Sequence, residues 1–180
     1  DVERSRGLGV CIRDRIGTMK VYIGIDPGQR GFVSIVNVDG KVIKSFPLLK
    51  NSKNVDVVEI SQNLFDLSIY EGRCHVILED VHSIFGSSAK SNFNFGWIVG
   101  VIEGTLSTLG LPYTKVAPKT WQKVMHQGIA KNENKKIMSL MACHKLFPTV
   151  DLRRTIRCKN EDDNFADSLL MAEYGRRKNL

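Results

Sequence analysis

The sequence predicts an α/β domain in which a five-stranded mixed sheet is flanked by helices. Three consecutive strand patterns come first, separated only by turn residues, and helical and strand patterns then alternate along the chain. Strands joined by tight turns pair antiparallel, whereas strands separated by a helix usually pair in parallel. The order of the patterns therefore predicts a sheet that contains both kinds of pairing.

The first three strands are expected at residues 20–26, 32–38 and 42–48. Apolar residues alternate with smaller ones in the first of them, as in a strand that packs against a core. Asp39-Gly40, between the second and third strands, is a two-residue sequence that favours a hairpin turn. We expect these strands to form one antiparallel unit.

The rest of the chain is expected to hold helices and two further strands. An apolar run predicts a buried central strand at 74–81, and a shorter strand is expected at 112–116. Residues 83–94 are rich in glycine, serine and asparagine, which predicts a loop. Periodic apolar residues predict helices at 55–70, 94–109, 118–126, 132–147 and 163–176.

The helix expected at 94–109 has glycines at spacing four: Gly96, Gly100 and Gly104. Each glycine costs a helix about 1 kcal/mol relative to alanine. Such a costly arrangement makes sense where another backbone packs closely against the helix.

A chain of 180 residues is long enough for one sizeable core, and no linker or internal repeat divides it. We expect a single domain at 19–180, beginning at Met19 directly before the first strand. Residues 1–18 are charged and lack periodicity, so we expect a flexible extension or an expression remnant. No stretch approaches the roughly 20 apolar residues of a membrane span, and we therefore expect a soluble protein.

The protein is basic, with 26 Lys and Arg residues against 19 Asp and Glu, a net charge of +7 and a pI near 9.3. A basic surface attracts nucleic acids, anionic membranes or acidic proteins. Nucleic acid is the first expectation among these. The four cysteines form no C-x-x-C pair, so free thiols in a reducing compartment are favoured over a zinc site.

Asp26 stands where an apolar strand runs into the turn Pro27-Gly28. A carboxylate at the end of a buried strand loses hydration, which is costly unless something binds it. A divalent cation would remove that cost.

Three further acids stand where they could join Asp26. Glu79 ends the central strand, and Asp163 and Asp167 are four residues apart near the start of the last helix, where they share one face. Oxygen ligands without histidine or thiolate suit Mg²⁺ or Mn²⁺. Four carboxylates can hold two such ions about 4 Å apart, the arrangement used in phosphodiester hydrolysis. Beside a basic surface, the four acids predict a nuclease.

Each acid also has a simpler interpretation. Asp26 before Pro-Gly can be only a turn former, and Glu79-Asp80 can be a solvated strand end. Asp162 and Asp163 can cap the last helix, and we expect no other role for Asp162. The catalytic hypothesis depends on the four acids occurring together.

Three motifs, IGIDPG at 23–28 with Gly31, VILE at 76–79 and DNFADSLLMA at 163–172, together resemble those of the RuvC-type Holliday-junction resolvases of the RNase H-like superfamily. The resemblance covers residues 20–177. The ending ADSLLMAEYGRR at 166–177 looks more like phage and chloroplast members than the standard bacterial enzyme.

The resemblance implies an RNase H-like fold and a homodimer, with the helix around 97–106 helping to form the dimer. It further implies paired symmetric nicks across four-way DNA junctions in recombination and repair, with two Mg²⁺ or Mn²⁺ ions per active site. Asp26, Glu79 and Asp167 match the family's acidic triad. Asp163 falls where the fourth ligand is expected, although the family places its last two acids three residues apart and position 164 here is Asn. The cytoplasm of a bacterial or phage-infected cell, or an organelle, would be the location.

Basic residues flank the acids and are candidates for contacts with DNA phosphates, which position DNA without reading its sequence. Phe85 and Phe93, in the predicted loop, are candidates for stacking on unpaired bases or for insertion at the junction centre; anchoring of the loop in the core is the alternative. The DNA-binding candidates are Lys119, Lys123, Lys131, Lys135, Lys136, Arg153, Arg154, Arg157, Phe85 and Phe93. For any single lysine, a solvated helix face is the simpler interpretation.

Two other functions stay open. The first is an RNase H-like nuclease that acts on RNA–DNA hybrids or flaps. The second is a non-catalytic module that binds branched DNA, in which the acids only cap secondary-structure elements.

Overall fold

A computed structural model of the chain describes residues 19–51, 53–81, 86–131 and 134–180. Its sheet has five strands in the order β3-β2-β1-β4-β5. The strands are β1 (Val21–Asp26), β2 (Phe32–Asn37), β3 (Val42–Pro47), β4 (Cys74–Glu79) and β5 (Tyr113–Val116). The first three pair antiparallel, and β4 pairs in parallel with both β1 and β5. The predicted mixed sheet is confirmed; the extension expected at 1–18 lies outside the described residues.

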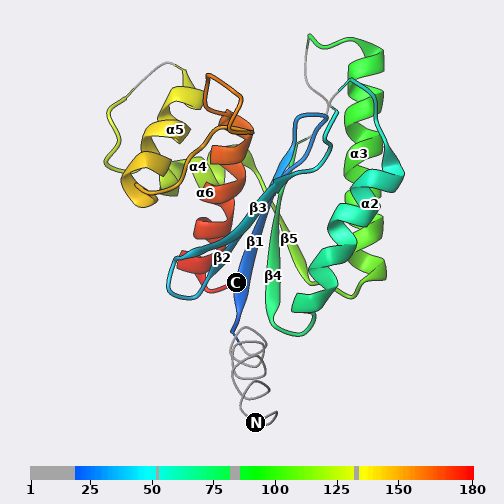
Figure 1. Ribbon diagram of the computed structural model, residues 1–180, viewed down its shortest axis with the longest axis horizontal. Coiled ribbons are helices and arrows are strands. Elements are labelled where there is room, and N and C mark those ends of the chain that lie inside the picture. Colours follow the sequence, from blue (N-terminus) through cyan, green and yellow to red (C-terminus); the bar gives the residue numbers. More distant parts are fainter. Residues whose placement is uncertain (1–18, 52, 82–85, 132–133) are drawn as a thin grey trace, which may run out of the picture.

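Helices cover both faces of this sheet, as Figure 1 shows. One face carries α2 and α3, and the other carries α4, α5 and α6. Every residue of β1 and β2 is buried, because these central strands have a helical layer on each side. The helical elements are α2 (Val57–Phe65), the 3-10 helix η1 (Asp66–Tyr70), α3 (Ala89–Thr108), α4 (Pro118–Met125), α5 (Lys135–Leu146) and α6 (Asp163–Lys178).

The last helix lies directly on the first strand. A Cβ atom at Gly24 in β1 would clash with the carbonyl oxygen of Ser168 and stand 2.6 Å from the backbone nitrogen of Ala172. Only glycine therefore lets the backbones of β1 and α6 approach this closely. The contact brings the start of α6 beside the end of β1.

Two helices differ from the sequence prediction. The helix expected at 55–70 ends at Phe65 and continues as a 3-10 turn. The helix expected from residue 94 begins at Ala89, because the Ser88 hydroxyl accepts a hydrogen bond from the Ser91 amide and caps it. The predicted loop at 83–94 was therefore too long. Among the described helices, none is both long enough and apolar enough to cross a membrane.

Candidate active site

Two of the four predicted acids stand side by side at the ends of neighbouring strands. The parallel register pairs Ile25 with Leu78, so the next residues, Asp26 and Glu79, follow at the same level. In parallel strands, residues at the same level point to the same face of the sheet. Asp26 is only 8% exposed, and Glu79 is partly buried.

The other two acids lie at the start of α6. Asp162 caps this helix by accepting a hydrogen bond from the Asn164 amide, as predicted, and Asp163 and Asp167 follow in the first turns. All of these acids raise the pKa of Asp26 by repulsion. The structure thus places Glu79, Asp163 and Asp167 within electrostatic range of Asp26 at this end of the sheet.

Burial raises the pKa of three of the acids, and repulsion by neighbouring acids adds to this effect for Asp26 and Asp167. The pKa of Asp26 is raised well above its usual range, first by burial and then by Glu79, Asp167 and Asp163. Burial also raises the pKa of Glu79, which a hydrogen bond from Trp121 partly counteracts. The pKa of Asp167 is raised to about 7 by burial and by the charges of Glu79 and Asp163, against hydrogen bonding from Ser139. Such clusters of perturbed acids are typical of functional sites.

Two acids have cationic partners that sequence reasoning missed. Asp162 is 2% exposed and forms ion pairs with Arg154 at 2.9 Å and Arg30 at 3.7 Å. Burial alone would raise the pKa of Asp162, but hydrogen bonds from Arg154 and Asn164 leave it below its usual value. The expectation that Asp162 only caps α6 was incomplete. Asp163 pairs with Lys136 at 2.7 Å.

The four acids suit a divalent cation in chemistry, although their side chains are not arranged around a common point. Among the described residues, no three His, Cys, Asp or Glu side chains lie in an arrangement that would hold one ion. However, Oδ1 of Asp167 is buried and has no hydrogen-bond partner in the part of the chain that the structure describes, which is costly for a carboxylate oxygen. Hard oxygen donors and an unpaired buried oxygen fit Mg²⁺ or Mn²⁺. Binding would require the carboxylates to turn toward one another and Asp163 to exchange Lys136 for the ion.

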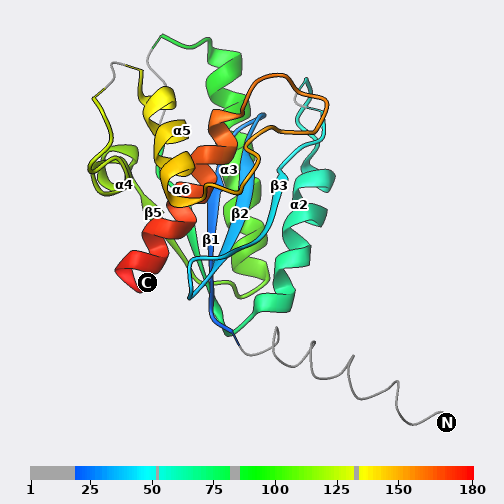
Figure 2. The same cartoon turned by 60° about the vertical axis from the view of Figure 1, so that its left-hand side comes forward.

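Four of the basic candidates fall into two groups. The first lies near the acids. Lys136 binds Asp163 there, and Arg154 binds Asp162 and donates to the carbonyl oxygens of Arg30 and Leu49. Figure 2 shows the loop between α5 and α6, which carries Arg154, crossing the end of the sheet where β1 ends. Arg154 is therefore engaged within the protein, and a contact with DNA would compete with these bonds.

The second group lies on α4. Lys119 and Lys123 line a pocket of about 520 Å³ together with Lys178 and Tyr174 at the end of α6. No ion pair within the described residues involves these three lysines. Three unpaired cations around one pocket attract anions.

The remaining basic candidates are exposed or have local partners. Arg153 pairs with Asp151 at 2.6 Å, and Lys135 contacts the sulfur of Met138. Lys131 and Arg157 are exposed. Nothing in these contacts prevents them from meeting a phosphate, and their role in DNA binding stays a prediction.

The two aromatic candidates have different outcomes. Phe85 lies outside the described residues. Phe93 is 70% exposed, but it lies in α3 and not in a loop, so that the predicted setting was wrong. Its ring is 6.2 Å from that of Trp97, and the two line a pocket of about 440 Å³ with Asn92 and Gly96.

The fold and the acid cluster define a class: a mixed α/β domain of the RNase H-like type, with a carboxylate cluster where β1, β4 and α6 meet. Comparison with solved structures finds the same fold in RuvC of Thermus thermophilus. The structure of that protein in complex with a Holliday junction substrate matches with a TM-score of 0.64 at 15% identity, over 86% of this chain and 92% of the other. Another structure of T. thermophilus RuvC matches with a TM-score of 0.56 at 20% identity, over 89% of this chain and 97% of the other. At this identity the likeness shows the fold.

No family model matches the sequence, and a search of curated proteins finds no match.

Proposed function

We propose that this protein is a metal-dependent endonuclease that resolves four-way DNA junctions by paired symmetric nicks. The observation that carries the proposal is the cluster of Asp26, Glu79, Asp163 and Asp167 at one end of a RuvC-like sheet. The T. thermophilus RuvC with this fold was solved with a Holliday junction substrate. The resemblance of residues 166–177 to phage and chloroplast members of this group is part of the proposal.

In the proposed reaction, Asp26, Glu79, Asp163 and Asp167 hold the divalent cations. Two bound ions would lower the pKa of a water molecule and stabilise the leaving oxygen. The four carboxylates fix the positions of the metal ligands. Burial of Asp26 and Asp167 keeps competing water away from their carboxylate oxygens. Lys136 neutralises Asp163 until an ion replaces it.

Substrate binding would use the lysine pocket of α4 and the exposed cations. Lys119, Lys123 and Lys178 have no acidic partner among the described residues, so that a DNA phosphate would bring a counter-charge without first breaking an ion pair. Such contacts make affinity fall steeply with salt.

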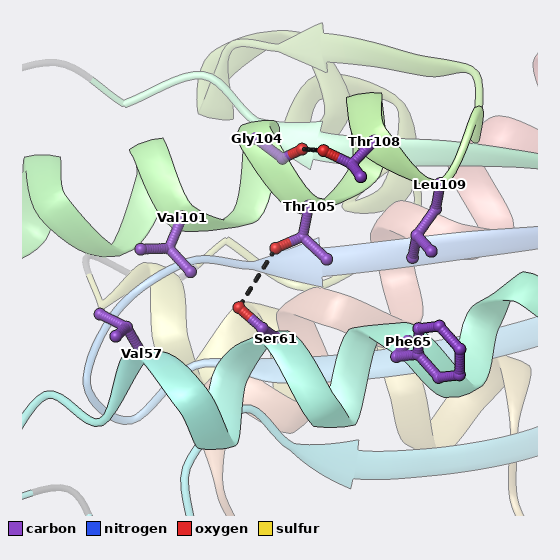
Figure 3. Close-up of a pocket in the computed structure, with 8 residues that line it drawn as sticks. All are labelled: Val57, Ser61, Phe65, Val101, Gly104, Thr105, Thr108 and Leu109. Carbon is purple, nitrogen blue, oxygen red and sulfur yellow. Dashed lines mark hydrogen bonds between the residues drawn. The ribbon is translucent and has the colours of Figure 1, made fainter.

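A homodimer is part of the proposal, because two nicks placed symmetrically across the junction require two active sites. On α3, a Cβ atom added at Gly96, Gly100 or Gly104 meets no described atom within 4 Å, so the described residues of one chain leave the glycine face uncovered. A pocket of about 560 Å³ lies between α2 and α3 and is lined by Gly104, Phe65 and Val101 among others. Figure 3 shows these residues. The Ser61 and Thr105 hydroxyls hydrogen-bond across the gap between the helices. A second copy of α3 would cover this surface.

The catalytic proposal is tested with a panel of four-way junction, flap, RNA–DNA hybrid and plain duplex in Mg²⁺ and in Mn²⁺. Symmetric nicks on the junction are expected on denaturing gels. Asp26→Asn and Glu79→Gln should abolish cleavage and leave junction binding intact. Asp66→Asn is the matched control, because Asp66 is an exposed acid whose ion pair among the described residues is with Lys44. Robust cutting by either site variant would defeat the assignment, and preference for the hybrid or flap would favour those substrates instead.

The dimer is tested with Gly100→Arg. A side chain at this position has open space within the protomer, so the variant should fold and yet sediment as a monomer. Met141→Arg, at an exposed position on α5, is the control on the other face of the sheet. If Gly100→Arg still forms the dimer, the interface lies elsewhere than on α3. A monomeric wild-type protein would refute the proposed homodimer.

A further inference from the structure

Trp121 is the one aromatic side chain among the described residues that hydrogen-bonds to a predicted acid. Its indole Nε1–H donates to Oε1 of Glu79 at 3.0 Å. Trp121 is completely buried, and its bond lowers the pKa of Glu79 against the effect of burial. A hydrogen bond to a carboxylate is about twice as strong as one between neutral groups.

The ring that carries this donor is held firmly. Trp121 lies in the first turns of α4, which begins with Pro118 at its first position, where the fixed φ of proline suits a helix. The edge of His126 packs against the indole, with ring centroids 5.9 Å apart and planes at 79°. His126 is in turn hydrogen-bonded to Ser139 of α5 at 3.1 Å. The indole N–H therefore points at Glu79 from a rigid support.

The partner of Glu79 differs in kind from those of its neighbours. Asp163 and Asp162 are paired with Lys136 and Arg154, whereas within the described ranges no Lys or Arg forms an ion pair with Glu79. A cation at Glu79 would cancel the negative charge and compete with a metal ion. A neutral N–H fixes the direction of the carboxylate and leaves its charge in place.

We propose that Trp121 is a positioning residue, which holds one oxygen of Glu79 so that the other remains available, with its charge, to bind a divalent cation. This inference rests on the proposed function of the acid cluster. Partners that orient metal ligands are commonly worth 10- to 100-fold in metal affinity. Loss of the indole N–H should weaken metal binding by roughly that factor.

The test removes the indole N–H of Trp121 and keeps an aromatic ring at this position. Trp121→Phe is the first variant. β-(3-Benzothienyl)alanine, which matches indole in shape and has sulfur in place of N–H, is the second and guards against loss of folding from the smaller ring. Mn²⁺ affinity is measured by calorimetry, and junction affinity is measured without metal. In both variants we expect a loss of Mn²⁺ affinity of about 10-fold or more and an unchanged affinity for the junction.

A double-mutant cycle separates positioning from a general structural effect. In a Glu79→Gln background, the change at Trp121 should cost no further Mn²⁺ affinity, because the amide no longer supplies the ligand that the indole orients. Equal losses in both backgrounds would overturn the proposal. So would Mn²⁺ affinity within twofold of wild type in the benzothienyl variant.

Fluorescence supplies a spectroscopic check. The chain has two tryptophans, so that Trp121 is the sole one in a Trp97→Phe reference protein. Paramagnetic Mn²⁺ bound at Glu79 should quench this emission, whereas Mg²⁺ should not, and Glu79→Gln should remove the effect. Absence of quenching at saturating Mn²⁺ counts against the proposal. If the wild-type protein binds Mn²⁺ but nicks no DNA, the proposed function fails while the role of Trp121 in metal binding stands.

Discussion

Removing the charge of Asp167 should stabilise the protein without metal and inactivate it. Asp167 has a pKa raised to about 7 by burial and by the neighbouring acids, against about 4 in an unfolded chain. A group whose pKa is higher in the folded state stabilises the protein fully at pH values below its unfolded-state pKa. That stabilisation is lost as the pH rises through its folded-state pKa. The metal-free protein should therefore become less stable between about pH 4 and pH 7.

The size of this change in stability follows from the pKa shift of Asp167. A difference of about 3 pKa units corresponds to a penalty of about 4 kcal/mol at pH 8, where Asp167 is charged in both states. At pH 5 the folded protein keeps the proton, and the penalty is only about 1–2 kcal/mol. Asp167→Asn escapes this dependence because an amide does not titrate.

Urea unfolding of metal-free wild type and Asp167→Asn at pH 8 and at pH 5 is the assay. We expect the variant to gain about 2–3 kcal/mol more over wild type at pH 8 than at pH 5, or roughly 5–10 °C in Tm for a chain of this size. Mn²⁺ should stabilise wild type at pH 8 and have little effect on the variant. A gain that is equal at both pH values, or larger at pH 5, would refute the reasoning from buried charge.

Three other changes test separate parts of the structure. Arg154→Met leaves the buried carboxylate of Asp162 without its main partner and should cost about 3–5 kcal/mol in urea unfolding; a loss below about 1 kcal/mol would contradict a buried ion pair. Gly24→Ala forces β1 and α6 apart and should cost at least about 1–3 kcal/mol, whereas unchanged stability would mean that the two backbones separate freely. Lys119→Gln with Lys123→Gln should lower the slope of log affinity for a junction against log salt by about 0.9 for each DNA phosphate that the protein no longer neutralises, and an unchanged slope would place the DNA elsewhere.

Much of the fold could be predicted because its signals are local. Strand patterns and the Asp39-Gly40 hairpin define the antiparallel unit, which the structure contains at β1 to β3. The start of α3 could not be predicted in the same way. Ser and Asn between residues 88 and 94 favour loops by propensity, but the Ser88 hydroxyl caps the first turn and the helix begins there. Phe93 was misplaced for that reason.

The acids of the candidate site could be predicted as a group because each stands at a recognisable position, at a strand end or a helix start. Their partners could not. Trp121 is 42 residues from Glu79 in sequence, and in an amphipathic helix it looks like an ordinary core residue. Lys136 was expected on the surface facing DNA, yet it pairs with Asp163. Such pairings depend on how α4, α5 and α6 pack, which periodicity does not reveal.

The order of the elements along the chain has a consequence for synthesis in the cell. The four acids come from the first strand, the fourth strand and α6, which follows every other described element. A growing polypeptide that has emerged only as far as α5 has the sheet but lacks Asp163 and Asp167. Because docking of α6 on β1 completes the set, an unfinished or C-terminally truncated product would hold half of the acids. Under the proposed function, a nascent chain would lack part of its metal site until α6 had been made and folded onto β1.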